Sequence, residues 1–223
     1  MNEEQNKKRK KTKKNRRRSS AFTKANKKHC KIVVLGSSAC GKTSLIKRFV
    51  EMKFSEDHIE TVEDLYHQSY KYRGRHYTLK ITDMASPFQF PAMRDLHIQK
   101  AEIALLMYEI DCQTSYNEAL QTFKIIRGLR PLVPVILVGT KQDIISLNRQ
   151  NSDDYIESFY SDAISANGHI LTSSKDNVGV KEAFEMALDE LDKRKCGKES
   201  EESICDSTFS VESSNSLSKC NIL

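Results

Sequence analysis

Four apolar runs identify the middle of the chain as a set of buried strands. Three of them are short, rich in β-branched residues and almost free of polar side chains. Runs of this kind are typical of strands buried on both faces, as in a parallel sheet covered by helices. They lie at 31–36, 103–110 and 133–139, and a weaker fourth follows at 169–172.

Apolar residues recur at helical spacing between these runs. They predict helices at 43–50, 114–129, 153–165 and 179–195. The stretch 61–83 contains two extended segments joined by a short polar turn, which predicts a β-hairpin. Strands that alternate with helices predict an α/β fold. We expect a six-stranded, mostly parallel sheet with one antiparallel strand and helices on both faces.

The two ends of the chain differ in composition from the middle. Residues 1–28 hold 13 Lys and Arg against two Glu, a net charge of +11. The whole chain carries +6, so the remaining residues carry −5. We expect a disordered polybasic tail at 1–29, a folded domain at 30–195 and a disordered Ser-rich tail at 196–223. No apolar run is long enough to span a membrane as a helix. The six cysteines lack the spacing of metal ligands, so we expect them to be reduced thiols in a cytosolic protein.

A glycine-rich motif joins the first strand to the first helix. Its pattern, G-x-x-x-x-G-K-T, is that of a phosphate-binding loop. Backbone N–H groups of such a loop and of the helix N-terminus face an anion, while its Lys attracts the β- and γ-phosphates and its Thr offers a hydroxyl to Mg²⁺. The motif by itself does not separate GTP from ATP, and a chance match stays open. The residues are Gly36, Ser37, Ser38, Ala39, Cys40, Gly41, Lys42 and Thr43.

Three further short segments follow predicted strands. Asp143, in the segment that begins Thr140-Lys141, can accept two hydrogen bonds from the edge of guanine, a pair that adenine does not offer. Asp83 ends a strand and can hold Mg²⁺ directly or through water. Each is weak alone, because a charged turn or a capping carboxylate is the commoner reason for such residues. The third segment, in which a backbone N–H could reach the guanine carbonyl, contains Ser173, Ser174 and Lys175.

In this order the elements resemble the small GTPases of the Ras superfamily, over about residues 30–195. The segment Gln89-Phe-Pro-Ala-Met93 is most similar to the Di-Ras and Rhes-type branch. The resemblance implies the P-loop small-GTPase fold, bound GTP or GDP, and Mg²⁺ held by Thr43, Thr61 and Asp83. It also implies that Phe54 lies beside the guanine and that Thr61, in the first switch segment, contacts the γ-phosphate.

Four positions depart from the family pattern. Thr140 replaces the usual Asn, as in the Rho branch, so guanine binding should survive. Ser38 replaces a loop glycine and crowds the γ-phosphate, and Ser86 replaces the glycine whose N–H reaches that phosphate. Pro87 stands where the family has the Gln that orients the attacking water. Because Pro has no side-chain hydrogen-bonding group, we expect slow intrinsic hydrolysis and assign no catalytic residue.

The last four residues, Cys220-Asn-Ile-Leu, form a C-a-a-X pattern that predicts geranylgeranylation. One lipid anchors a protein only marginally, so a second signal is expected, either the basic tail or palmitoylation of Cys196 or Cys205. We therefore expect the chain at the cytoplasmic face of a membrane, the plasma membrane first. A nuclear localisation signal with a nuclear pool, a non-specific nucleic-acid contact and a merely solvated arm remain alternatives for the tail.

Three functions fit these features. The first is a GTP/GDP signalling switch, which we expect to be a monomer with effector, exchange-factor and GTPase-activating partners and no specific nucleic acid. The second is a hydrolysis-deficient, mostly GTP-loaded binding module, which Ser38, Ser86 and Pro87 favour. The third is a P-loop kinase or ATPase, against which Asp143 and the Cys220 pattern argue.

Overall fold

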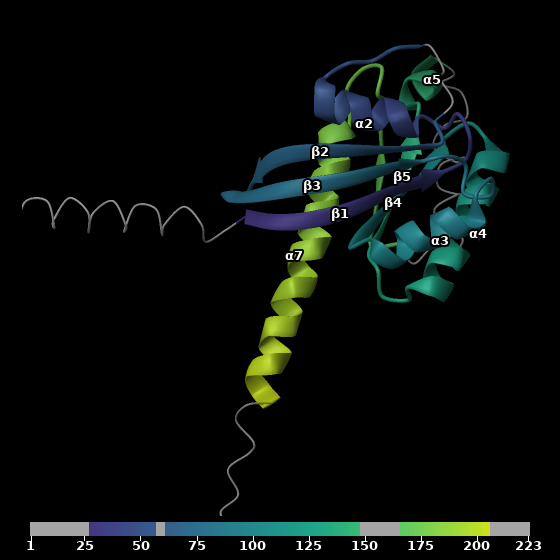
Figure 1. The fold of residues 1–223 in the computed structure, drawn as a ribbon. Coiled ribbons are helices and arrows are strands. Elements are labelled where there is room, and N and C mark those ends of the chain that lie inside the picture. Colours follow the sequence, from purple (N-terminus) through teal and green to yellow (C-terminus); the bar gives the residue numbers. More distant parts are fainter. Residues whose placement is uncertain (1–26, 57–60, 148–165, 206–223) are drawn as a thin grey trace, which may run out of the picture.

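A six-stranded sheet forms the centre of the molecule (Figure 1). The computed structural model describes residues 27–56, 61–147 and 166–205. The strand order is β2-β3-β1-β4-β5-β6; only β2 and β3 are antiparallel, and the other neighbours are parallel. This confirms the predicted mixed sheet. The strands are β1 (Lys27–Gly36), β2 (Glu63–Tyr72), β3 (Arg75–Met84), β4 (Ile103–Glu109), β5 (Val135–Thr140) and β6 (Gly168–Leu171).

Helices cover both faces of the sheet. Side chains alternate along a strand, so Ile32 and Val34 of β1 pack with α2 and α7, whereas Val33 and Leu35 pack with α3 and α4. On the first face the rings of Phe49 in α2 and Phe184 in α7 stack, with centroids 3.9 Å apart. The described helices are α2 (Lys42–Glu51), α3 (Pro91–Lys100), α4 (Gln113–Leu129), α5 (Gln142–Leu147) and α7 (Val180–Cys205).

Both ends of the domain extend beyond their predicted limits. β1 begins at Lys27, so the last residues assigned to the basic tail belong to the sheet. Their polar side chains predict a tail. β3 nevertheless pairs with them from Lys27 onward, and Lys28 Nζ lies 2.7 Å from Asp192 Oδ1 of α7. α7 continues to Cys205, so the predicted disorder from 196 onward is wrong for the described part, Cys196 included. Glu, Lys and Ser extend a helix at small cost once packing has nucleated it.

Two other helices differ from prediction. α3 and α5 are short and were not predicted; α3 carries a weak apolar stripe and buries only Arg94 and Ile98. The helix predicted at 153–165 lies outside the described residues, as do 1–26 and 206–223. Among the helices that the structure describes, none combines the length and the apolar character needed to cross a bilayer.

Candidate functional site

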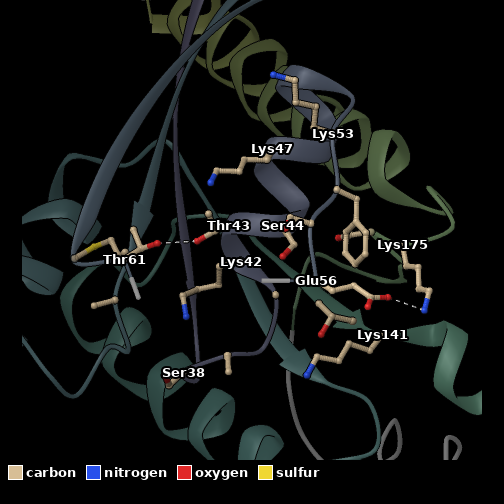
Figure 2. Close-up of a pocket in the computed structure, with 18 of the residues that line it drawn as sticks. Ser38, Lys42, Thr43, Ser44, Lys47, Lys53, Glu56, Thr61, Lys141 and Lys175 are labelled. Carbon is tan, nitrogen blue, oxygen red and sulfur yellow. Dashed lines mark hydrogen bonds and ion pairs between the residues drawn. The ribbon is translucent and has the colours of Figure 1, made fainter. Parts of the chain in front are cut away.

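A pocket of about 1020 Å³ opens at the carboxyl ends of β1, β3 and β5 (Figure 2). In parallel sheets, loops at this end converge and commonly form the ligand site. Most of the residues predicted from sequence to bind nucleotide line this pocket. They are Ser38, Ala39, Gly41, Lys42, Thr43, Phe54, Thr61, Ser86, Thr140, Lys141, Asp143, Ser174 and Lys175.

The other predicted residues lie behind the pocket wall and hold it in shape. Each is hydrogen-bonded to a residue that lines the pocket. Gly36 O and Ser37 O accept bonds from Lys42, and Cys40 O accepts one from Thr140. Asp83 accepts a hydrogen bond from Thr43, and Ser173 donates one to Asp143. The structure therefore brings together every described residue of the predicted site.

The glycine-rich loop between β1 and α2 takes its shape from two glycines. Gly41, the N-cap of α2, has a φ of 91°, which favours residues without a Cβ. At Gly36 a Cβ would collide with the carbonyl oxygen of Met107 in β4. Lys42 is buried, and its ammonium donates to Gly36 O at 2.9 Å and Ser37 O at 2.6 Å, so the charge is held at the loop.

A candidate divalent-cation site lies beside Thr43. Its hydroxyl donates to Asp83 Oδ2 at 2.6 Å and lies 3.0 Å from the hydroxyl of Thr61, as Figure 2 shows for the two threonines. Asp83 is fully buried, and burial raises the pKa of its carboxyl. Among the described residues, its other oxygen, Oδ1, has no hydrogen-bond partner. A buried, unsatisfied carboxylate oxygen next to two hydroxyls fits a hard cation such as Mg²⁺.

The described residues contain no cluster of three His, Cys, Asp or Glu that could hold a metal ion. A cation at Thr43, Thr61 and Asp83 would therefore have few protein ligands. Mg²⁺ is commonly bound in this way, through one or two carboxylates, water and the phosphates of a nucleotide. The residues present fit a cation that arrives with a phosphorylated ligand.

Two side chains organise the far side of the pocket. Asp143, at the start of α5, accepts a hydrogen bond from Ser173 Oγ at 2.8 Å through Oδ1. Thr140 is buried, and its hydroxyl reaches Cys40 O at 2.7 Å and Tyr108 O at 3.0 Å. Thr140 thus ties the glycine-rich loop to β4 and β5, so a hydroxyl performs a positioning task at the place of the usual Asn.

Sequence reasoning missed Arg48 of α2. Its guanidinium donates to the carbonyl oxygens of Ser174 and Lys175, both at 2.7 Å, and lies over the ring of Phe54 at 5.8 Å. Arg48 therefore fixes the loop after β6 against the segment after α2. No local pattern marks this role, because the two carbonyl groups that Arg48 binds are more than 120 positions away in the chain.

Charge in the pocket favours an anion. Across its mouth, Lys175 Nζ lies 3.1 Å from Glu56 Oε1 (Figure 2), and Lys141 Nζ lies 2.7 Å from Glu109 Oε2. The lysines outnumber the carboxylates among the lining side chains, and positive charge with a helix N-terminus is suited to phosphate. The charged lining residues are Lys42, Lys47, Lys53, Lys141 and Lys175 against Glu51, Glu56 and Asp143.

The segment after β3 forms a fixed turn. The N–H of Gln89 donates to Ser86 O at 3.0 Å, with Pro87 at the second position of the turn, where its fixed φ fits. Pro87 is buried, and its carbonyl accepts a hydrogen bond of 2.9 Å from the buried Arg94 of α3. Ser86 and Gln89 line the pocket, whereas Pro87 does not.

The cysteine of the glycine-rich loop is not exposed to the pocket. Cys40 is fully buried, and burial raises the pKa of its thiol although Lys42 opposes the shift. A buried, protonated thiol reacts slowly with oxidants, because the thiolate is the reactive species.

Comparison with known proteins identifies relatives of the chain. The Ras family model matches residues 31–193. Di-Ras2 of Mus musculus, a GTP-binding protein, is 36% identical over 171 residues, which are 74% of this chain and 82% of Di-Ras2. The GTP-binding protein drn-1 of Caenorhabditis elegans is 29% identical over 76% of this chain and 78% of its own length. Human Rhes is 30% identical over 71% of this chain and 63% of Rhes.

Proposed function

The chain is a small GTPase that belongs to the Ras family, near the Di-Ras and Rhes branch, and we propose that it is a membrane-associated GTP/GDP switch that hydrolyses GTP slowly. The family supplies the reaction: GTP is converted to GDP and phosphate. The slow rate and the membrane are the parts of the proposal that concern this chain in particular.

In this proposal each side of the pocket holds one part of the nucleotide. Lys42 neutralises the β- and γ-phosphates, and the glycine-rich loop donates its N–H groups to them. Asp143 accepts the two donors of the guanine edge, with Ser173 fixing the carboxylate at 2.8 Å. Thr43, Thr61 and Asp83 would hold Mg²⁺, which neutralises developing phosphate charge when it is bound.

Thr61 couples the pocket to the first switch segment. Its hydroxyl lies 3.0 Å from that of Thr43. One residue on, Val62 O accepts a hydrogen bond of 3.0 Å from Ala85 N, just before the fixed turn. Loss of the γ-phosphate removes a ligand from this region and releases the segment, which is how such switches report hydrolysis.

The single observation that supports slow hydrolysis is Pro87. It occupies the place of the water-orienting Gln, it is buried, and the bond of 2.9 Å from Arg94 to its carbonyl holds it there. The side chain of a proline offers neither donor nor acceptor to a water molecule, and its backbone has no N–H to donate. Gln89 does line the pocket, so we take its side chain as the alternative contact for a water there. His58 lies outside the described residues.

Single-turnover hydrolysis of bound GTP tests this proposal. Without a partner protein we expect a rate below the ~10⁻⁴ s⁻¹ scale of Ras. A rate at or above that scale would contradict the proposal. The nucleotide that co-purifies with the chain should be identified in the same preparation by chromatography.

A second function deserves the same assay. The chain could stay loaded with GTP and act as an effector-binding module, as Ser38 in the loop, Ser86 and Pro87 all suggest. Co-purified GTP would support this module, and co-purified GDP would support the cycling switch. ATP, or no nucleotide, would contradict the premise of both.

Ras-family proteins act through effectors, exchange factors and GTPase-activating proteins, and the partners of this chain are unidentified. Large exposed apolar side chains lie at 62–65 and 88–96, on the segments next to Thr61 and Pro87, and His97 of α3 lies 3.0 Å from Glu63 of β2. We propose that this surface binds effectors and that the chain itself is a monomer. The exposed side chains are Val62, Leu65, Phe88, Phe90 and Leu96.

Membrane association rests on the two ends of the chain. Cys220 begins the C-a-a-X pattern, and residues 1–28 carry a net +11. We expect a Cys220→Ser variant to leave membranes in a cell-fractionation experiment. Neutralising the basic residues within 7–18 should weaken membrane binding and leave nucleotide affinity unchanged. An unchanged distribution of the second variant would mean that the tail serves another purpose.

A further inference from the structure

The uncovered end of the sheet presents an unusual set of side chains. α3 and α4 cover one face of β1, β3 and β4 near the pocket, but β1, β2 and β3 run on beyond these helices (Figure 1). Side chains alternate along a strand, so the pairing register decides which residues share the uncovered area. This area lies at the start of β1, whereas the pocket lies at its end.

The register places three cross-strand rows on this area, which we call the basic sheet face. Each row joins one residue of β1 to one of β3 and one of β2. Lys27 is placed by its backbone register alone, and the other eight positions contain three Lys and three His, and no acidic residue. The rows are Lys27, His76 and Lys71; His29, Thr78 and Ser69; and Lys31, Lys80 and His67.

Burial agrees with the register. His29, Lys31, His67, Lys71, His76 and Lys80 are all exposed. Their neighbours along the strands point to the other face, where Tyr70 of β2 bonds to Glu185 of α7 at 2.6 Å and Tyr77 of β3 bonds to Asp192 at 2.6 Å. These carboxylates therefore belong to α7 and lie against the other face of the sheet, and the basic groups are left on the opposite side.

Two acidic residues border this face and lie outside its three rows. Glu102 accepts a bond from the backbone N–H of Lys31 at 3.0 Å, at the border with β4. Glu63 lies on the same side of β2 but toward the pocket, 3.0 Å from His97. Like charges placed opposite one another across strands disfavour the sheet, so a partner of opposite charge would relieve them.

We infer that the basic sheet face is a docking surface for an anionic lipid membrane. The inference builds on the proposed membrane association and adds the part of the folded domain that touches the lipid. Three observations favour this partner: the face is broad and uniformly basic, the polybasic segment joins it directly at Lys27, and contact there leaves the nucleotide pocket at the other end of β1 open. Basic groups close to an anionic leaflet each add about 1 kcal/mol to binding.

A nucleic acid is the competing partner, and the chemistry of the face disfavours it. Sheets that bind single strands stack bases on exposed aromatic side chains. The nine positions contain no Phe, Tyr or Trp, and the tyrosines of β2 and β3 lie on the opposite face toward α7.

The test uses the full chain with Cys220→Ser, so that no prenyl group contributes. Partition is measured by co-sedimentation with phosphatidylcholine vesicles that contain or lack phosphatidylserine. Lys71→Thr with Lys80→Thr removes two charges from the face and keeps strand-forming side chains. Lys124→Gln with Lys181→Gln is the matched control, because both are exposed on helices elsewhere and the change of net charge is the same.

We expect the face variant to bind phosphatidylserine vesicles about 30-fold more weakly, from about 1 kcal/mol for each charge. The control should change less than threefold or so on the same scale. Equal losses in the two variants would overturn the inference, because net charge or the tail alone would then explain binding. Bound nucleotide verifies that each variant is folded.

A second arm separates the competing partner. Single-stranded RNA and duplex DNA are titrated against the same proteins. A face variant that loses nucleic-acid binding while its vesicle partition is unchanged would overturn the inference. Failure of the cellular Cys220→Ser prediction would count against the lipid anchor alone, because this assay uses no lipid-modified chain.

Discussion

The two sides of the nucleotide pocket differ in how completely they are equipped. On the binding side, Lys42, Thr140 and Asp143 are each hydrogen-bonded into place by residues behind the wall. On the hydrolysis side, two hydrogen bonds hold the turn that contains Pro87. The N–H of Gln89 donates to Ser86 O, and Arg94 donates to Pro87 O. Firm positioning is thus common to both sides, and only the chemical groups differ. Under the proposed function, such a site binds nucleotide firmly but hydrolyses it slowly, because the side chain that orients water is absent.

The largest effect should come from the binding side. Lys42→Met removes a buried charge that donates two hydrogen bonds to the glycine-rich loop. In the proposed complex this charge binds the nucleotide phosphates, and a hydrogen bond between charged groups contributes about 1.5–3 kcal/mol, so its loss should lower the affinity for GTP and GDP by about 100-fold. Titration with a fluorescent guanine nucleotide measures it. Retained affinity with a normal unfolding curve would show that the loop does not bind phosphate.

Asp143→Asn should change which base binds. An amide can donate to the carbonyl of xanthine, but it opposes the exocyclic amine that guanine has at the same position. GTP affinity should fall by about 100-fold while XTP affinity rises. Competition between the two nucleotides measures this ratio. Asp176→Asn is the matched control, because Asp176 is an exposed carboxylate just after Ser173, the residue that binds Asp143. This control should leave the ratio unchanged.

Pro87→Gln is the direct test of the hydrolysis side. It restores the missing side chain and keeps the backbone carbonyl that Arg94 binds. We expect the single-turnover rate to rise by about tenfold or more, with nucleotide affinity unchanged. Pro87→Ala is the control for a loosened turn and should not accelerate the reaction. If Gln89→Ala abolishes residual hydrolysis, the water is oriented from Gln89 instead.

The smallest effect concerns the pH dependence of stability, through His169 in β6. Burial lowers the pKa of His169 in β6 to about 4, and its Nε2 lies 3.1 Å from the hydroxyl of Tyr108. In the unfolded chain the imidazole takes up a proton below about pH 6.5. The unfolded state therefore binds more protons between about pH 6.5 and 4, and stability falls as the pH is lowered through that window.

With a discount for its partial exposure, this effect should reach about 1–2 kcal/mol. Urea unfolding of the wild type and of His169→Gln at several pH values measures it. The variant should lose less stability on acidification than the wild type. Identical slopes for the wild type and the variant would show that other groups dominate.

Sequence alone determined the local requirements of this protein. The G-x-x-x-x-G-K-T spacing predicts a phosphate loop because backbone geometry there demands glycine at Gly36 and Gly41. The apolar runs predict buried strands. The lack of a side-chain hydrogen-bonding group at Pro87 is a property of the residue itself and does not depend on the fold. These properties depend on neighbours within a few residues. The C-a-a-X pattern and the basic segment are also local, so the sequence alone reveals them. The membrane association that they indicate stays a prediction.

Tertiary structure decided the properties that depend on distant partners. Arg48 acquires a role only because the loop after β6 returns to α2, and the unsatisfied oxygen of Asp83 exists only because burial removes water from it. Side chains alternate between the two faces of a β-strand, so the sequence indicates which residues of one strand share a face. It does not indicate which strands pair or where the covering helices end. Strand register and helix length made Lys27 part of β1 and gathered the charges of three strands into one basic sheet face.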